Sequence, residues 1–164
     1  MASDSELYKL AVRLGHHLTG TARRLVSAES CTGGWIGKVI TDVPGSSNWY
    51  VGGAITYSNE LKRSLLGVDE ETLTTHGAVS DATVIAMASG ALERLGGDIA
   101  VAVSGIAGPD GGMPGKPVGT VWIGWASRHG QAVHTSSRLK IIDGDREKVR
   151  RRTIWAALNG VIEL

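Results

Sequence analysis

Leucines near the start of the chain recur at the spacing of one helix face. They stand three or four positions apart, which places side chains on a common side of an α-helix; they are Leu7, Leu10, Leu14 and Leu18. Ser3 and Glu6 precede them in the pattern of a capping box, in which each side chain accepts a hydrogen bond from the other residue's backbone amide. Gly20 is a suitable residue to end the helix. The pattern therefore predicts a first helix from the capping serine to this glycine.

Further along the chain, apolar runs alternate with helical patterns. Buried strands read as short, nearly continuous apolar runs, whereas amphipathic helices show apolar residues three or four positions apart. Strands are predicted over residues 23–28, 51–57, 99–103, 119–126 and 132–141. Helices are predicted over residues 33–41, 58–66 and 81–95, and from residues 143–145 toward the C-terminus. Residues 69–77 read as a turn-rich linker, and residues 127–130 as the turn of a hairpin.

The order of these elements indicates an α/β protein. Helices that alternate with apolar strands favour a sheet covered by helices on both faces. We therefore expect a three-layer α/β/α sandwich with one mixed sheet, and a single domain over residues 1–164, because no repeat or boundary interrupts the pattern. The strand ends that carry Ser30, Tyr57 and Ser104 are expected near one edge of the sheet, where such folds place ligands.

Composition narrows the class of partner. Lysine and arginine total 17 and aspartate and glutamate total 16, so the formal charge is +1, which gives no electrostatic case for nucleic acid or an anionic membrane. One cysteine excludes an intrachain disulfide and fits a reducing compartment. Residues 1–20 contain no long apolar run of the kind found in a signal peptide or membrane span. We expect a cytoplasmic protein that binds neither nucleic acid nor membrane.

The turn after the first predicted strand carries two candidate nucleophiles, Ser30 and Cys31. Gly33 and Gly34 follow and allow another group to approach the backbone closely. The helix that starts there offers backbone N–H groups to an anion or a developing oxyanion. Cys31 is either a thiolate stabilised by the helix start or a small buried apolar residue. Glu29 is either a partner that orients Lys62 or a capping carboxylate.

Lys62 is the candidate base. If Ser58 caps the short helix, Lys62 lies near its positive end, and its stem shares the apolar face of Leu65 and Leu66. Both effects lower the pKa of a lysine. A neutral lysine can take the proton of a serine hydroxyl, and Tyr57 could relay or orient that proton. The alternative is a solvated surface lysine.

Two further features limit the chemistry. The five histidines have no metal-ligand spacing with Asp, Glu or Cys, so neither a metal site nor a serine–histidine–aspartate triad is expected; they are His16, His17, His76, His129 and His134. Phosphate-loop and dinucleotide signatures are absent, and no cofactor is expected. The glycine- and proline-rich loop 104–117 is interpreted as a cradle for phosphate or ribose, or else as a rigid lid or interface loop. The arginines of the last helix are interpreted as a mostly solvated face.

Several stretches together resemble the CinA C-terminal-domain family. They occur in family order over nearly the whole chain: Ala28-Glu29-Ser30-Cys31-Thr32-Gly33-Gly34, Pro44-Gly45-Ser46-Ser47, Thr56-Tyr57-Ser58-Asn59-Glu60-Leu61-Lys62, His76-Gly77-Ala78-Val79-Ser80, Ser104-Gly105-Ile106-Ala107-Gly108-Pro109-Asp110-Gly111-Gly112, Lys116-Pro117-Val118-Gly119-Thr120-Val121 and Gly144-Asp145-Arg146. Characterised members are nicotinamide-nucleotide amidases. The resemblance implies a three-layer α/β/α fold, a homo-oligomer and the stand-alone form without the N-terminal pyrophosphatase-type domain of many members.

The resemblance also implies roles for individual residues. It places a serine nucleophile at Ser30, a lysine base at Lys62 and a tyrosine at Tyr57, which together deamidate nicotinamide mononucleotide to nicotinate mononucleotide and ammonia. We expect substrate contacts from Thr32, Gly33, Gly34, Ser104, Gly105 and Arg146, the last toward the phosphate. Two other readings are a non-catalytic nucleotide-binding or competence-linked partner protein, and an amidase that uses Cys31.

Overall fold

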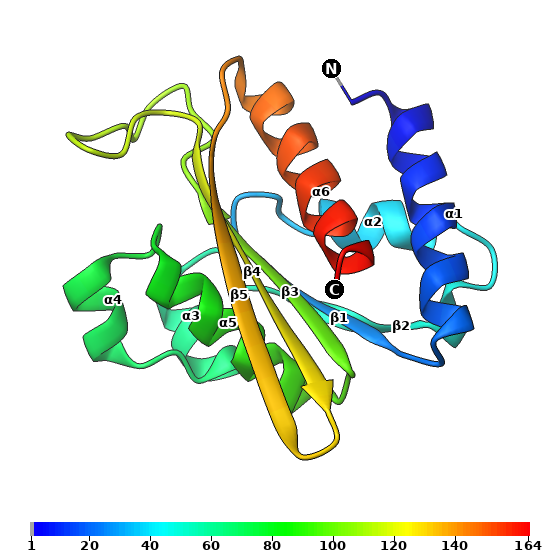
Figure 1. Cartoon of the computed structure of the whole chain (residues 1–164). Helices are drawn as coiled ribbons and strands as arrows, with labels where there is room; N and C mark the ends of the chain where they lie inside the picture. Colours follow the sequence, from blue (N-terminus) through cyan, green and yellow to red (C-terminus); the bar gives the residue numbers. More distant parts are fainter. Residues whose placement is uncertain (1) are drawn as a thin grey trace.

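A computed structural model describes residues 2–164 and contains a five-stranded mixed sheet of order β2-β1-β3-β4-β5 (Figure 1). The strands are β1 (Leu25–Glu29), β2 (Tyr50–Ile55), β3 (Ile99–Gly105), β4 (Thr120–His129) and β5 (Ala132–Ile141). The helices are α1 (Asp4–Gly20), α2 (Trp35–Thr41), α3 (Asn59–Leu66), α4 (Glu70–His76), α5 (Asp81–Leu95) and α6 (Arg146–Ile162), with a 3₁₀ turn, η1, at Ser46–Asn48.

Helices cover both faces of the sheet, which confirms the predicted sandwich. Figure 1 shows α1, α2 and α6 together on one face and α3, α4 and α5 on the other. The side chains of β3 alternate between two cores: Val101 and Val103 pack on the side of α1 and α6, whereas Ala100 and Ala102 face α5. Small side chains beneath α5 let that helix approach the sheet closely.

The predicted first helix is confirmed with its cap. Both hydrogen bonds of the capping box between Ser3 and Glu6 are present, and α1 extends to Gly20. Leu7, Leu14 and Leu18 are almost fully buried against the core on the α6 side. The leucine spacing was therefore a sufficient signal for this element.

The linker predicted over residues 69–77 is wrong, because residues 70–76 form α4. Asp69 precedes the helix and Leu73 is its buried apolar residue. A helix of seven residues with one buried side chain has too few positions to show a helical period. Its packing against α5 stabilises it instead.

The predicted hairpin is confirmed, but its turn is shorter than expected. β4 continues through residues 127–129 and reverses direction around Gly130, which has a positive φ of 60°. Ser127 is buried, and its hydroxyl accepts a hydrogen bond from Arg23 Nη2 at 2.8 Å. The sequence pattern predicts a turn at this polar residue. In the structure it lies inside the strand, because Arg23, which is distant in sequence, donates a hydrogen bond to its buried hydroxyl.

Three strands end at one edge of the sheet, as predicted. β1 pairs in parallel with β2 and with β3, so their carboxyl ends coincide. Pairing continues past β1, since the Ser30 amide donates to the Val103 carbonyl at 3.1 Å and the Thr56 amide to the Glu29 carbonyl at 2.7 Å. Ser30, Tyr57 and Ser104 are thereby brought to the same region.

The position of α3 depends on close packing against α5. Gly90 of α5 lies against the backbone carbonyl of Leu66, the last residue of α3, where a β-carbon would clash. The Ser58 side chain caps α3 by accepting the Leu61 amide at 3.2 Å. These contacts fix the helix that carries Lys62.

Candidate active site

A cavity of about 270 Å³ lies at the carboxyl edge of β1, β2 and β3. Its lining includes six of the nine residues predicted to form the site: Ser30, Tyr57, Lys62, Ser104, Gly105 and Arg146. Cys31 and Asp110 also line it. Residues from separate parts of the chain therefore surround one small space.

Lys62 and Ser30 are hydrogen-bonded to each other in this cavity. Lys62 Nζ lies 3.1 Å from Ser30 Oγ, and it also donates to the backbone carbonyls of Thr56 at 2.8 Å and Tyr57 at 3.4 Å. The Lys62 side chain is 1 % exposed. A solvated surface lysine is thus the wrong reading, because this amine is buried and aimed at the serine hydroxyl.

Burial lowers the pKa of Lys62 to about 8. Removing an ammonium group from water disfavours its charged form, and among residues 2–164 no carboxylate forms a salt bridge with it. A large fraction of Lys62 is therefore neutral at mildly alkaline pH. A neutral amine 3.1 Å from a hydroxyl can accept its proton.

Cys31 directly follows Ser30, and its surroundings keep its side chain in the thiol form. It is 5 % exposed, and burial, with a smaller contribution from the Glu29 carboxylate, raises the pKa of its thiol to about 12. A thiolate is the reactive form of cysteine. This environment favours the reading of Cys31 as a small buried residue.

Glu29 caps helix α2 and does not orient Lys62. Its carboxylate is 2 % exposed and accepts four hydrogen bonds. The donors are Thr32 Oγ1 at 2.6 Å, the amides of Gly34 and Ile36, both at 3.0 Å, and the amide of Gly37 at 2.9 Å. The buried carboxylate thus satisfies the amides at the start of α2, as a capping group does.

The structure does not bring Thr32, Gly33 and Gly34 into the cavity with Ser30. Thr32 is fully buried and bonded to Glu29. Gly33 and Gly34 have φ of 60° and 92° and form the turn before α2, which therefore starts at residue 35 rather than 33. Both glycines line a separate hollow beside Trp35 and Lys38. The geometry gives these residues a role in shaping the turn.

Residues of the glycine-rich loop 104–117 and of α6 also line the cavity. Ser104 Oγ donates to the Ala78 carbonyl at 2.7 Å, which joins β3 to the segment before α5. Arg146 is exposed, and its Nη1 donates to the Gly108 carbonyl at 2.7 Å. Tyr57 is 64 % exposed at the cavity. A cation is thus held at the cavity while the serine–lysine pair is buried.

Sequence reasoning missed two residues at or near the cavity. Asp110 lines it from the glycine-rich loop. Arg150 was assigned to a solvated face, yet its Nη2 donates to the Thr32 carbonyl at 2.8 Å. The sequence carries one signal for Arg150, since it stands four positions after Arg146 and residues four apart share one side of a helix.

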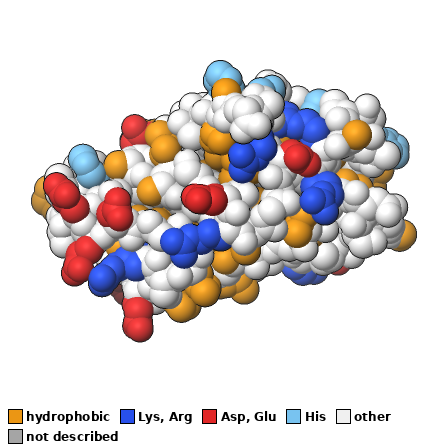
Figure 2. All heavy atoms as spheres, turned by 90° about the horizontal axis from the view of Figure 1, so that it is seen from below, with side chains coloured by type: hydrophobic (Ala, Val, Ile, Leu, Met, Phe, Trp, Pro, Cys, Tyr) orange, Lys and Arg blue, Asp and Glu red, His pale blue; other side chains and the backbone are white. Residues whose placement is uncertain are grey.

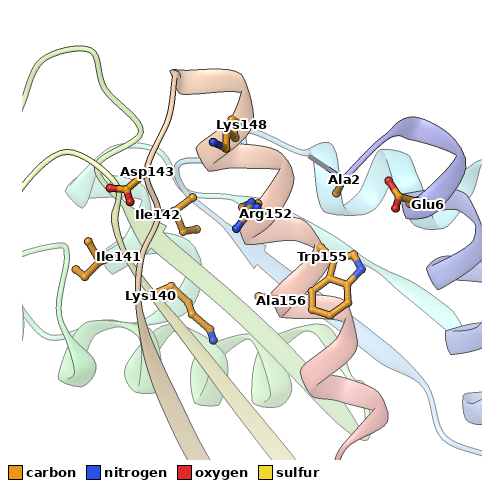
Figure 3. Close-up of a pocket in the computed structure, with 10 residues that line it drawn as sticks. All are labelled: Ala2, Glu6, Lys140, Ile141, Ile142, Asp143, Lys148, Arg152, Trp155 and Ala156. Carbon is orange, nitrogen blue, oxygen red and sulfur yellow. The ribbon is translucent and has the colours of Figure 1, made fainter.

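A larger cavity lies elsewhere, between the end of β5, α6 and the start of α1 (Figure 3). It measures about 710 Å³ and includes Lys140, Lys148, Arg152 and Trp155. Its lining contains no serine, cysteine or histidine. It is an open, partly basic groove whose lining offers no serine or cysteine nucleophile.

Surface charge on the underside of the molecule is mixed. Figure 2 shows basic side chains interspersed with acidic and hydrophobic ones, and acidic side chains gathered at the end where α4 lies. Within residues 2–164, no group of three histidine, cysteine, aspartate or glutamate side chains is placed to hold a metal ion. In the same residues, every helix is too short or too polar to cross a bilayer.

Comparison with known proteins finds a family whose model matches most of this chain, and relatives of similar sequence. The CinA C-terminal domain model matches residues 7–164. The chain is 50 % identical over 156 residues to the nicotinamide-nucleotide amidohydrolase PncC of Escherichia coli K12, which covers 95 % of this chain and 93 % of that protein. It is 52 % identical over 155 residues to PncC of Pseudomonas putida, with 94 % of each covered.

A solved structure shares the fold over almost the whole chain. The competence/damage inducible protein CihA of Agrobacterium tumefaciens superposes with a TM-score of 0.90 at 42 % identity. The match covers 98 % of this chain and 95 % of that one. The sandwich with its mixed sheet is therefore the fold of solved relatives.

Proposed function

We propose that this chain, which belongs to the CinA C-terminal domain family, is a nicotinamide-nucleotide amidohydrolase with a serine–lysine catalytic pair. It hydrolyses nicotinamide mononucleotide to nicotinate mononucleotide and ammonia, a reaction of pyridine nucleotide (NAD) recycling. Two curated relatives with this activity in their names align with nearly the full chain at 50 % and 52 % identity. The observation that supports the mechanism most directly is the 3.1 Å contact between Lys62 Nζ and Ser30 Oγ.

The first half of the reaction forms an acyl-enzyme. Neutral Lys62 takes the proton of the Ser30 hydroxyl, and the serine oxygen attacks the carboxamide carbon of the nicotinamide ring. The cationic pyridinium ring withdraws electrons and makes that carbon more electrophilic. The resulting oxyanion needs N–H donors close to the serine. Protonated Lys62 then returns a proton to the leaving nitrogen, and ammonia departs.

The second half releases the acid. Lys62, neutral again, deprotonates a water molecule that attacks the ester carbon, and the bond to Ser30 Oγ breaks. The serine oxygen recovers a proton from Lys62 while nicotinate mononucleotide leaves. Tyr57, which lines the cavity beside the lysine, is proposed to orient or relay the proton that goes to ammonia.

The pH profile is expected to follow the ionisation of Lys62. Burial places its pKa at about 8, and only the neutral amine acts as a base. Below that value kcat/KM should fall about tenfold for each pH unit, and above it the rate should approach a plateau. Initial rates of ammonia release from pH 6 to 9.5 test this. A profile that stays flat from pH 6 to 8 would exclude the buried lysine as the base.

Arg146 is proposed to bind the substrate phosphate. It is a cation fixed at the cavity by the Gly108 carbonyl. Loss of a charge-assisted hydrogen bond weakens binding by about 1.5–3 kcal/mol, so Arg146→Met should raise KM for the mononucleotide about 10- to 100-fold. Turnover of nicotinamide riboside, which has no phosphate, should change little. Arg152→Met, on the same helix but in the separate groove, is the matched control. Equal losses on both substrates would contradict the phosphate role.

Purified protein incubated with nicotinamide mononucleotide tests the activity itself. Release of ammonia together with nicotinate mononucleotide supports the amidohydrolase. Binding of the nucleotide without turnover would instead support the non-catalytic, competence-linked reading. We further propose that the enzyme is cytoplasmic, as its single cysteine favours, and homo-oligomeric, as the family resemblance implies.

A further inference from the structure

The Arg150 side chain extends from α6 to the turn that carries the nucleophile. Its Nη2 donates to the Thr32 carbonyl at 2.8 Å, and its guanidinium lies over the Trp35 ring, 4.9 Å from the ring centre. Figure 1 shows α6 and α2 on the same face of the sheet. A hydrogen bond and a stacking contact thus hold this cation against the turn.

A short chain of hydrogen-bonded peptide groups begins at the Thr32 carbonyl, which accepts the hydrogen bond from Arg150. The peptide group of the Thr32 carbonyl includes the Gly33 amide, and that amide donates to the Ser30 carbonyl at 3.1 Å. The peptide group of the Ser30 carbonyl includes the Cys31 amide. Hydrogen bonds in series polarise one another. The guanidinium at one end therefore increases the positive character of the Cys31 N–H at the other.

The Cys31 amide is one of the few in this turn without an internal acceptor. The amides of Ser30, Gly33 and Gly34 are bonded to Val103, Ser30 and Glu29 respectively. Within residues 2–164 the Cys31 amide makes no hydrogen bond to the backbone or side chain of another residue. Cys31 lines the cavity and directly follows the nucleophile. In acyl-transfer enzymes the amide of that position commonly donates to the oxyanion.

We propose that Arg150 is a positioning residue that fixes and polarises the Cys31 amide as an oxyanion donor. This inference rests on the acyl-transfer mechanism proposed above. Arg150 does not line the cavity, so it acts through the turn without touching substrate. Because the oxyanion exists only in the transition state and intermediate, losing Arg150 should lower kcat and leave substrate affinity nearly intact.

The test compares Arg150→Met and Arg150→Lys with Arg151→Met. Arg151 lies over the same Trp35 ring at 4.9 Å but bonds to Asp4 and Glu147 and makes no hydrogen bond to the turn. Arg150→Met should lower kcat about tenfold or more, less than the 10²–10³-fold loss typical of removing an oxyanion donor outright. KM should stay within about twofold, and Arg150→Lys should keep more activity than Arg150→Met because it retains a cation. Arg151→Met should match the wild type within about twofold.

Two further readouts separate positioning from general stability. Guanidinium ion added to Arg150→Ala should restore part of kcat, and the midpoint of the pH profile should stay where Lys62 sets it. The inference is overturned if Arg150→Met retains full kcat, if it raises KM instead, or if Arg151→Met is equally impaired.

A labelling experiment that needs no turnover of nicotinamide mononucleotide distinguishes this inference from the proposed function. A fluorophosphonate reacts with a serine nucleophile when the serine proton passes to the neutral Lys62 amine, the serine oxygen bonds to phosphorus and fluoride leaves. The phosphoryl oxygen then occupies the oxyanion position. Slower labelling of Ser30 in Arg150→Met than in wild type, measured by mass spectrometry, supports the positioning role even if the wild type fails to hydrolyse the mononucleotide. Equal labelling rates overturn that role while leaving the amidohydrolase function unaffected.

Discussion

Ser30→Ala is expected to lower the rate of ammonia release from nicotinamide mononucleotide at least about 10⁴-fold, because the acyl-enzyme can no longer form. The hydroxyl that disappears is the one hydrogen-bonded to Lys62 Nζ. Residual turnover would come only from a water molecule activated in the same cavity. Steady-state assays of ammonia release measure the loss, and circular dichroism verifies that the variant is folded.

Two companion variants make the Ser30 result specific. Cys31→Ala removes the rival nucleophile and is expected to retain most of the activity, because burial holds that thiol in its protonated form. Ser64→Ala removes an exposed hydroxyl on α3 and should have no effect. An active Ser30→Ala enzyme combined with an inactive Cys31→Ala enzyme would make the cysteine the nucleophile.

Lys62→Arg is expected to lower kcat about 10³-fold, the scale of losing a general base. Arginine retains the positive charge but does not lose its proton in proteins. The pH dependence that Lys62 imposes should also disappear from the residual activity. Rates measured from pH 6 to 9.5 on matched protein concentrations provide both readouts.

A surface lysine supplies the control for that substitution. Lys38 of α2 is exposed and pairs with Asp42, the residue that follows the helix, so Lys38→Arg should leave the rate and its pH profile as in the wild type. Thermal unfolding of Lys62→Arg verifies that its larger head group has not disrupted the buried site. A folded Lys62→Arg enzyme with wild-type kcat would disprove the role of a neutral amine.

The main layers of the fold, and the position of Lys62 near the start of its helix, were predictable from local signals. Apolar runs such as residues 99–103 identify buried strands, and the cap at Ser58 places Lys62 at the start of its helix. The residue pattern alone left Lys62 open to a surface reading. Its burial is a property of how α3 packs against the sheet, which spacing does not report.

The unpredicted features depend on partners far away in the sequence or on the direction of a side chain. Arg150 meets Thr32 across 118 positions, and no helical period encodes that contact. Glu29 could have faced either Lys62 or the next helix, and only the turn geometry selects the helix amides. α4 is stabilised by packing with α5, so its short sequence carried a weak signal.

Helix α6 holds both loops that flank Ser30, the proposed nucleophile. Arg150 binds the carbonyl of Thr32 and Arg146 that of Gly108. During protein synthesis the N-terminal parts emerge first, so the ribosome releases the serine and its lysine well before these two arginines. Under the proposed mechanism, a nascent chain therefore contains Ser30 and Lys62 before it contains the two arginines that hold the flanking loops, and the site is completed only once α6 has been synthesised.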